Sequence, residues 1–155
     1  MKKIAVGSDE AGAVLRHAIV RHLRELGHPV ADYGVDDDSQ PYPSIAFEVA
    51  ERVAAGTHDR AILCCGTGVG MAIAANKIPG VYAANCHDVN SAQRARKSND
   101  AQILTLGESV VGREAALVIV DAWLASDFEA GRSKAKVDEI RAREQAIVSR
   151  PRPAR

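Results

Sequence analysis

The stretch RAILCCGTGVGMAIAANK, residues 60–77, decides the fold of this chain. An apolar run from Arg60 to Cys65 ends abruptly at three glycines that alternate with Thr67 and Val69, and the residues that follow are compatible with a helix. A short apolar run that is closed by a glycine turn and continues into a helix is typical of one strand–turn–helix unit. We therefore predict a strand at 60–65, a tight turn and a helix at 71–77.

The same alternation recurs on both sides of this unit. Strands are expected at 4–7, 29–33, 81–86 and 103–106, and helices at 11–26, 45–55, 88–97, 112–125 and about 133–148. Because parallel strands need crossover connections, this order predicts an α/β fold, a Rossmann-like three-layer sandwich with a parallel sheet of about five strands. A chain of 155 residues buries one core rather than two, so we expect a single domain over 1–148 and a disordered tail at 149–155.

The charge balance excludes several classes of partner. Lysine and arginine together number 20, as do aspartate and glutamate, so no overall positive field gathers nucleic acid or an anionic membrane surface. Charged residues interrupt every apolar stretch before the roughly 20 residues that cross a bilayer, and the apolar run after Lys3 is too short for an export signal. Three cysteines form no disulfide framework, which favours a cytoplasmic location.

Chemistry is expected at the glycine turn that follows Cys65. The missing Cβ atoms of Gly66, Gly68 and Gly70 let several backbone N–H groups point at one anion, and the start of the next helix adds partial positive charge. Such amides should stabilise a thiolate, which makes Cys65 a candidate general base, with Cys64 on the opposite side of the strand. The plainer interpretation is a turn whose glycines relieve steric strain beside a small buried thiol.

Two further groups are candidates because of their places along the chain. Asp9 ends the first strand, at the edge where parallel sheets bind ligands, and is either an orienting carboxylate or the N-cap of the next helix. Arg132 and Lys136, four residues apart near the start of the last helix, are either a phosphate clamp or an ordinary solvated face. The five histidines show no metal-ligand spacing, so we expect no metal site.

Several segments together resemble the family of ribose-5-phosphate isomerase B and galactose-6-phosphate isomerase. They are IAVGSD at 4–9, Tyr42-Pro43, CGTGVGMAIAANK at 65–77, Ser91-Ala92, Asn99-Asp100, Gly107, Val110-Val111-Gly112, VDAWL at 120–124 and Gly131-Arg132. The similarity covers about residues 3–145. The segment 65–77 is far more specific than a bare glycine pattern.

This resemblance implies an aldose–ketose isomerase of a small sugar phosphate that uses no metal or cofactor. Cys65 would move a proton between C1 and C2 through a cis-enediolate, whose oxygen the amides of Gly66 to Gly70 would hold. It further implies a homodimer or tetramer with sites between subunits, in which the neighbour supplies the Asn99 region. It implies that Thr67 and Asp9 line the sugar and are catalytic residues together with Cys65. The other substrate contacts are Glu10, Tyr42, Ser98 and Asn99, and Arg132 with Lys136 would bind the phosphate.

The chain departs from the ribose-phosphate pattern where substrate choice is decided. Glu10 replaces a common histidine and is more like the LacA subunit, Ser98 replaces the ring-opening histidine, Ser109 replaces an arginine and Lys136 replaces the second clamp arginine. Serine is a poor acid–base catalyst near neutral pH, so we expect slow opening of sugar rings. A tetrose 4-phosphate cannot close the usual five-membered ring. We therefore expect a tetrose 4-phosphate, rather than ribose 5-phosphate, to be preferred.

Three other interpretations stay open. The chain could be one subunit of a hetero-oligomeric isomerase, although subunits of the LacA type lack the cysteine motif that is intact here. It could be a non-catalytic module that binds a sugar phosphate. A nucleotide-binding site ranks lowest, because the glycine turn follows the third expected strand rather than the first.

Overall fold

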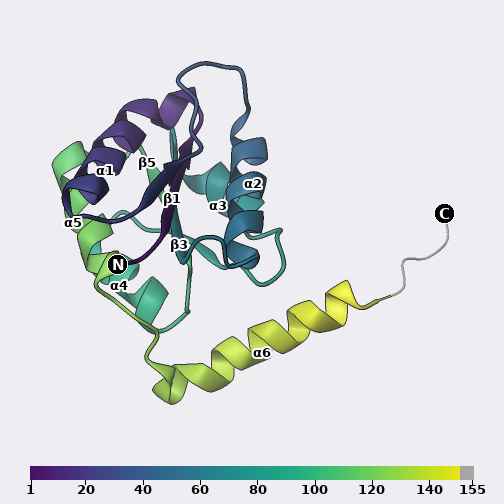
Figure 1. Ribbon diagram of the computed structural model, residues 1–155. Helices are drawn as coiled ribbons and strands as arrows, with labels where there is room; N and C mark the ends of the chain where they lie inside the picture. Colours follow the sequence, from purple (N-terminus) through teal and green to yellow (C-terminus); the bar gives the residue numbers. More distant parts are fainter. Residues whose placement is uncertain (151–155) are drawn as a thin grey trace, which may run out of the picture.

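A five-stranded parallel sheet forms the centre of the computed structural model, which describes residues 1–150 (Figure 1). The strands lie in the order β2-β1-β3-β5-β4. Their bounds are β1 Ile4–Ser8, β2 Val30–Asp32, β3 Arg60–Cys65, β4 Ala83–Asn85 and β5 Ile103–Gly107. Strands β1, β3 and β5 are buried along their whole length, as expected for strands that are covered on both faces.

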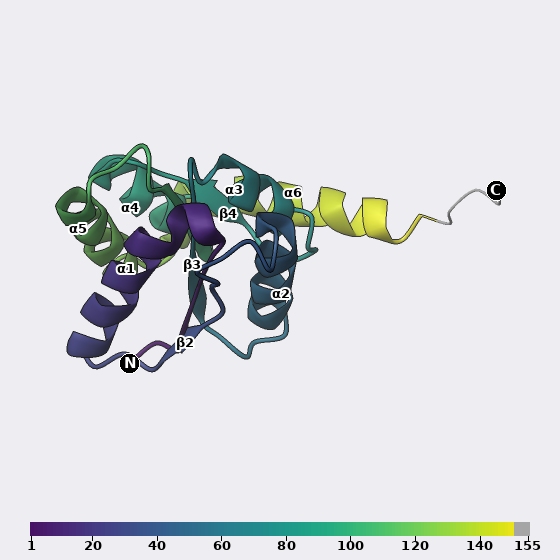
Figure 2. The same ribbon diagram turned by 90° about the horizontal axis from the view of Figure 1, so that it is seen from above.

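Helices cover both faces of this sheet (Figures 1 and 2). One face carries α1 (Ala13–Glu25), α4 (Val89–Lys97) and α5 (Arg113–Leu124), and the other carries α2 (Tyr42–Ala54) and α3 (Val69–Ala75). A short 3-10 helix, η1 (Glu10–Gly12), connects β1 to α1. The predicted Rossmann-like α/β sandwich is therefore confirmed.

Two apolar clusters fill the spaces between the sheet and its helices. Residues of β3 alternate between them, so that Ile62 and Cys64 pack towards α1, α4 and α5, while Leu63 and Cys65 pack towards α2 and α3. This is the period-two geometry of a strand with two buried faces. The prediction that the two adjacent cysteines face opposite sides is confirmed.

The last helix, α6 (Ala130–Val148), projects from the sandwich (Figures 1 and 2). Val137 is its buried residue, whereas Ile140, Ile147 and Val148 are at least half exposed. None of the helices within residues 1–150 is both long and apolar enough to cross a membrane.

Some boundaries differ from those expected. The second helix begins at Tyr42 rather than Ile45, because Pro41 in extended conformation precedes it and Pro43 is compatible with its first turn. Strand β4 covers Ala83–Asn85 instead of 81–86, and α6 begins at Ala130, with a kink at Gly131. The helix extends to Val148, and Ser149 and Arg150 follow as a turn. The rest of the expected disordered tail, 151–155, lies outside the described residues.

Candidate active site

The first group of candidate residues meets at the carboxyl ends of β1 and β3. These strands are neighbours, and Ser8 is in register with Cys64, so the next residues along each strand, Asp9 and Cys65, come side by side. The turn after β1 packs closely on β3, since a Cβ atom added to Gly12 would lie 2.7 Å from the backbone nitrogen of Cys65. Strand order reverses here, which is where open α/β sheets bind their ligands.

The thiol of Cys65 receives a hydrogen bond from the glycine turn. Cys65 is 6% exposed, and the N–H of Gly68 donates to its Sγ at 3.0 Å. Gly68 has a φ of 76°, a left-handed conformation that favours glycine, and this conformation turns its amide back towards the end of β3. The amide is therefore directed at the sulfur, where it would stabilise a negative charge.

Close backbone approach explains the other glycines around this turn. A Cβ atom on Gly70 would lie 2.6 Å from ring atoms of Tyr42, and one on Gly107 would lie 2.6 Å from the backbone of Thr67. Tyr42 therefore lies against the first turn of α3, and β5 supports the turn from the other side. The amides of Gly70 and Met71, in the first turn of α3, have no acceptor within the helix and can bind an oxyanion.

Asp9 has the character of a ligand-binding carboxylate. Its Oδ1 is buried without a hydrogen-bond partner, and its side chain does not cap the helix that follows. Burial raises the pKa of Asp9, against the opposing effect of the Gly12 and Ala11 amides. An unpaired buried oxygen is costly, so a hydroxyl donor from a ligand would be stabilised there. Thr67 and Glu10 are exposed at the same edge, and Thr67 Oγ1 accepts from the N–H of Val69 at 3.3 Å.

The second group of candidate residues gathers elsewhere in the molecule. Ser98 and Asn99, at the end of α4, line a cavity of about 350 Å³ together with Arg132 and Lys136 of α6. The hydroxyl of Ser98 accepts a hydrogen bond from Arg94, which lines the same cavity. Three cationic side chains around one hollow make a site suited to phosphate.

The two groups lie at opposite ends of the strands: the first at the carboxyl ends and the second beyond the amino end of β5. Cys65 is in register with Gly107, the last residue of β5, whereas Asn99 precedes Ile103, its first residue. A five-residue strand spans roughly 16 Å. Figure 1 shows the same separation, with α6 at the far end of the sheet from the start of α1. One sugar phosphate of four to six carbons is too short to contact both groups of a single chain.

Two polar residues beside the glycine turn were missed in the sequence. The side-chain amide of Asn85 donates to the carbonyl of Thr67 at 3.1 Å, and the N–H of Gly107 donates to Nε2 of His87 at 2.9 Å. Both follow or end β4, so both stand at the edge that carries Cys65. In the sequence, the position of both residues at the end of an expected strand could have identified them. The two side chains hold the backbone on either side of the glycine turn.

We expect His87 to make the protein less stable in acid. Burial lowers the pKa of His87 below its ordinary 6.5, against the opposing effect of Asp88. The neutral ring accepts a hydrogen bond from the Gly107 amide. The neutral ring therefore makes its full contribution to the free energy of unfolding above pH 6.5, and this contribution is lost as the pH falls below that value. Between pH 7.5 and pH 5 the melting temperature should fall by a few degrees. The fall should be smaller in His87→Gln, because the side-chain oxygen of glutamine can still accept the hydrogen bond from Gly107 and does not titrate.

The control for this experiment is His58. Burial also lowers the pKa of His58, and its titration should persist in His87→Gln. Equal acid sensitivity in His87→Gln and the unchanged protein would show that His87 does not titrate in this way.

Within residues 1–150, no three side chains of histidine, cysteine, aspartate or glutamate gather closely enough to hold a metal ion. The groups that do gather are a thiol, amides, hydroxyls and cations.

Comparison with known proteins identifies the family of this chain. The model of the Ribose/Galactose Isomerase family matches residues 4–140. D-erythrulose-4-phosphate isomerase of Pectobacterium atrosepticum is 47% identical over 142 residues, covering 90% of this chain and 93% of the relative. Ribose-5-phosphate isomerase B of Escherichia coli is 49% identical over 146 residues, covering 94% and 98%. The structure of ribose-5-phosphate isomerase B from Clostridium thermocellum matches with a TM-score of 0.90 at 43% identity, covering 93% and 98%. The chain belongs to the ribose/galactose isomerase family.

Proposed function

We propose that this protein interconverts an aldose phosphate and a ketose phosphate, with Cys65 as the base. The thiolate takes the proton from C2 of the aldose, the electron pair left behind forms the C1–C2 double bond of a cis-enediolate, and the π pair of the C1 carbonyl moves onto O1, which becomes the negative oxygen. Returning that proton to C1, with the hydroxyl proton shifting from O2 to O1, gives the ketose. The observation that carries this proposal is the Gly68 amide directed at Sγ of Cys65, beside first-turn amides that can hold the enediolate oxygen.

The other residues of the site then have distinct roles. The unpaired Oδ1 of Asp9 would accept a hydrogen bond from a substrate hydroxyl. Tyr42, which lies against Gly70, would border the sugar. Asn99 and Ser98 would contact the far end of the sugar. Arg132 and Lys136 would bind the phosphate, for which a cavity lined by cations is suited.

The preferred substrate in this proposal is a four-carbon sugar phosphate. The names of the relatives do not decide it, because an erythrulose-4-phosphate isomerase and a ribose-5-phosphate isomerase are similarly close. Ser98 favours the smaller sugar, since no imidazole stands there to open a ring. Assaying aldose and ketose phosphates of four, five and six carbons tests the activity and the substrate together.

We also propose a homodimer or tetramer in which each site is shared by two copies. Separation of Cys65 and Asn99 across the sheet supports this, because a second copy can bring the missing half. Exposed apolar residues supply surface for such contacts: Tyr42, Phe47, Val69 and Ile73 on α2 and α3, and Ile140 and Ile147 on α6. Three free, buried cysteines are consistent with a cytoplasmic location.

Complementation between inactive variants tests the shared site. Cys65→Ala and Arg132→Ala chains are each expected to be nearly inactive, yet their mixed dimer contains one site with both halves intact. Random mixing of co-expressed chains should therefore restore up to about a quarter of the normal turnover. Activity of the co-expressed sample no higher than that of either variant alone would place the whole site within one chain.

A further inference from the structure

Asp100 has an unusual backbone conformation beside the proposed phosphate cavity. Its φ is 55°, and it is the sole non-glycine residue with a positive φ within residues 1–150. Aspartate tolerates this left-handed region better than most residues, but the conformation still requires support from its surroundings. Asp100 directly follows Asn99, so its conformation sets where the cavity residues Ser98 and Asn99 lie. Such outliers often mark functional segments.

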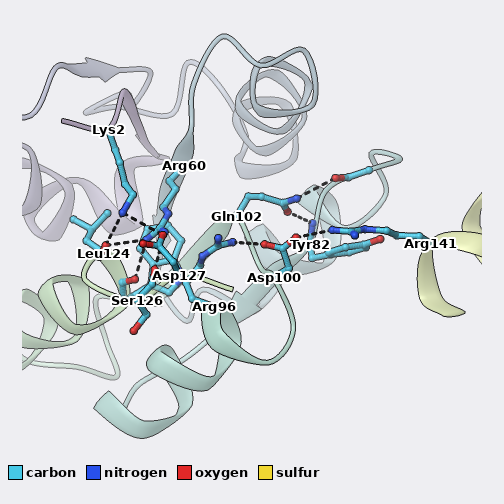
Figure 3. A network of polar contacts seen from close by, with 12 residues as sticks. Lys2, Arg60, Tyr82, Arg96, Asp100, Gln102, Leu124, Ser126, Asp127 and Arg141 are labelled. Atoms are coloured by element: carbon cyan, nitrogen blue, oxygen red, sulfur yellow. Dashed lines mark hydrogen bonds and ion pairs between the residues drawn. The ribbon is translucent and has the colours of Figure 1, made fainter. Parts of the chain in front are cut away.

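Two arginines hold the carboxylate of Asp100 from opposite sides (Figure 3). Arg96, from α4, is nearly buried, and its Nη1 lies 3.1 Å from Oδ1 without the alignment of a hydrogen bond. Arg141, from α6, donates from Nη2 to Oδ2 at 2.5 Å. The Asp100 side chain is 18% exposed, so water screens these pairs less than it would on an open surface.

The contact from Arg141 joins the two walls of the cavity. One wall is the end of α4, with Ser98 and Asn99, and the other is α6, with Arg132 and Lys136. The first turn of α6 contains the kinked Gly131, and most of the helix is exposed.

Contacts from three other residues fix α6 to the sandwich. At its start, the N–H of the N-cap residue Glu129 donates to the Lys97 carbonyl at 2.9 Å, and the two side chains form an ion pair at 3.3 Å. Further along, Val137 is buried, and Glu144 Oε2 accepts from the N–H of Gly80 at 2.8 Å. Gln102 secures the same loop by accepting from the Tyr82 amide at 2.9 Å, and Tyr82 lies beside Arg141 (Figure 3). The direction of α6, and with it the spacing of the cations, therefore depends on a small number of polar contacts.

We propose that Arg141 and Asp100 are positioning residues that set the width of the phosphate-binding half of the site. Neither side chain lines the cavity, so both act through Asn99 on one wall and through Arg132 and Lys136 on the other. This inference rests on the proposed function for the identity of the ligand. Losing the pair lets α6 move relative to α4, so the cations hold phosphate less well while the proton transfer at Cys65 is unaffected.

Three substitutions at the pair, with a matched control, test this role in the full chain. Arg141→Met keeps the length of the side chain without its charge, Arg141→Lys keeps the charge, and Asp100→Asn keeps a shape that tolerates the left-handed backbone. Arg143→Met is the control, because Arg143 is exposed on the same helix and forms no ion pair within the described part of the chain. The readouts are KM, kcat, the melting temperature and the calorimetric Kd for inorganic phosphate.

We expect Arg141→Met and Asp100→Asn each to raise KM and the phosphate Kd about tenfold with kcat within about twofold. Arg141→Lys should recover part of the loss, the double variant should be no worse than either single one, and Arg143→Met should be unchanged. A lower melting temperature with unchanged KM and phosphate Kd would show a merely structural pair and overturn the proposal. Absence of turnover in the unchanged protein, with weaker phosphate binding in Arg141→Met, would reject the isomerase while supporting the positioning role.

Discussion

Replacing Cys65 with alanine is expected to lower kcat by about 10³-fold or more, with little change in KM. Transfer of a proton by a positioned side chain contributes roughly 10²- to 10⁴-fold to rate, and the Gly68 amide is directed at the sulfur of Cys65. In the proposed site, substrate binding depends on Asp9, the amides and the phosphate cavity, which this substitution leaves in place. Steady-state turnover of an aldose phosphate measures the effect.

Controls separate the chemistry of Cys65 from its packing. Loss of the thiol leaves the Gly68 amide unpaired, at a cost of about 1 kcal/mol, so the melting temperature should fall by only a few degrees. Cys65→Ser restores an acceptor for that amide but not a readily ionised group, and it should be nearly as inactive. Cys64→Ala, in the opposite apolar cluster, should lose stability and keep its turnover. Turnover above a tenth of normal in Cys65→Ala would contradict the assigned role.

The second large effect expected is a preference for four-carbon over five-carbon substrate. We expect kcat/KM for erythrulose 4-phosphate to exceed that for ribose 5-phosphate by about 10²-fold or more, because ribose 5-phosphate must first open its ring. Ser98, whose hydroxyl already accepts from Arg94, cannot exchange protons with a ring oxygen as an imidazole does. Assays of both sugars with the same enzyme preparation measure the ratio directly.

Introducing an imidazole gives the converse test. Ser98→His should raise kcat/KM for ribose 5-phosphate by about tenfold while changing the value for erythrulose 4-phosphate little. Ser149→His, which adds the same group at an exposed position after α6, serves as the control. Faster turnover of ribose 5-phosphate than of erythrulose 4-phosphate by the unchanged protein would refute the explanation based on Ser98.

Much of the fold and the first half of the site could be predicted because each depends on short-range pattern. The run from Arg60 to Cys65 and the glycines after it identify a buried strand and a turn, and alternation alone places Cys64 and Cys65 on opposite faces. Ends of parallel strands share one edge, which places Asp9 and Cys65 together. The start of α2 was missed because Pro43 can occupy either a loop or the first turn of a helix.

The remaining features depend on how distant elements pack. Nothing local in the sequence shows that the N–H of Gly107 finds His87, or that Arg141 reaches Asp100 across 41 residues. The separation of Asn99 from Cys65 also follows only from the strand order and register. Side-chain type identifies candidates for chemistry, whereas the topology decides which of them share a site.

Exchange of the C2 proton of a bound aldose phosphate in deuterated water, followed by NMR, tests the role of the thiol most directly. The unchanged protein should wash deuterium into the substrate or product, and Cys65→Ala should show no exchange above the uncatalysed rate while still binding inorganic phosphate normally. Exchange that continues at the normal rate without the sulfur would mean that another group removes the proton.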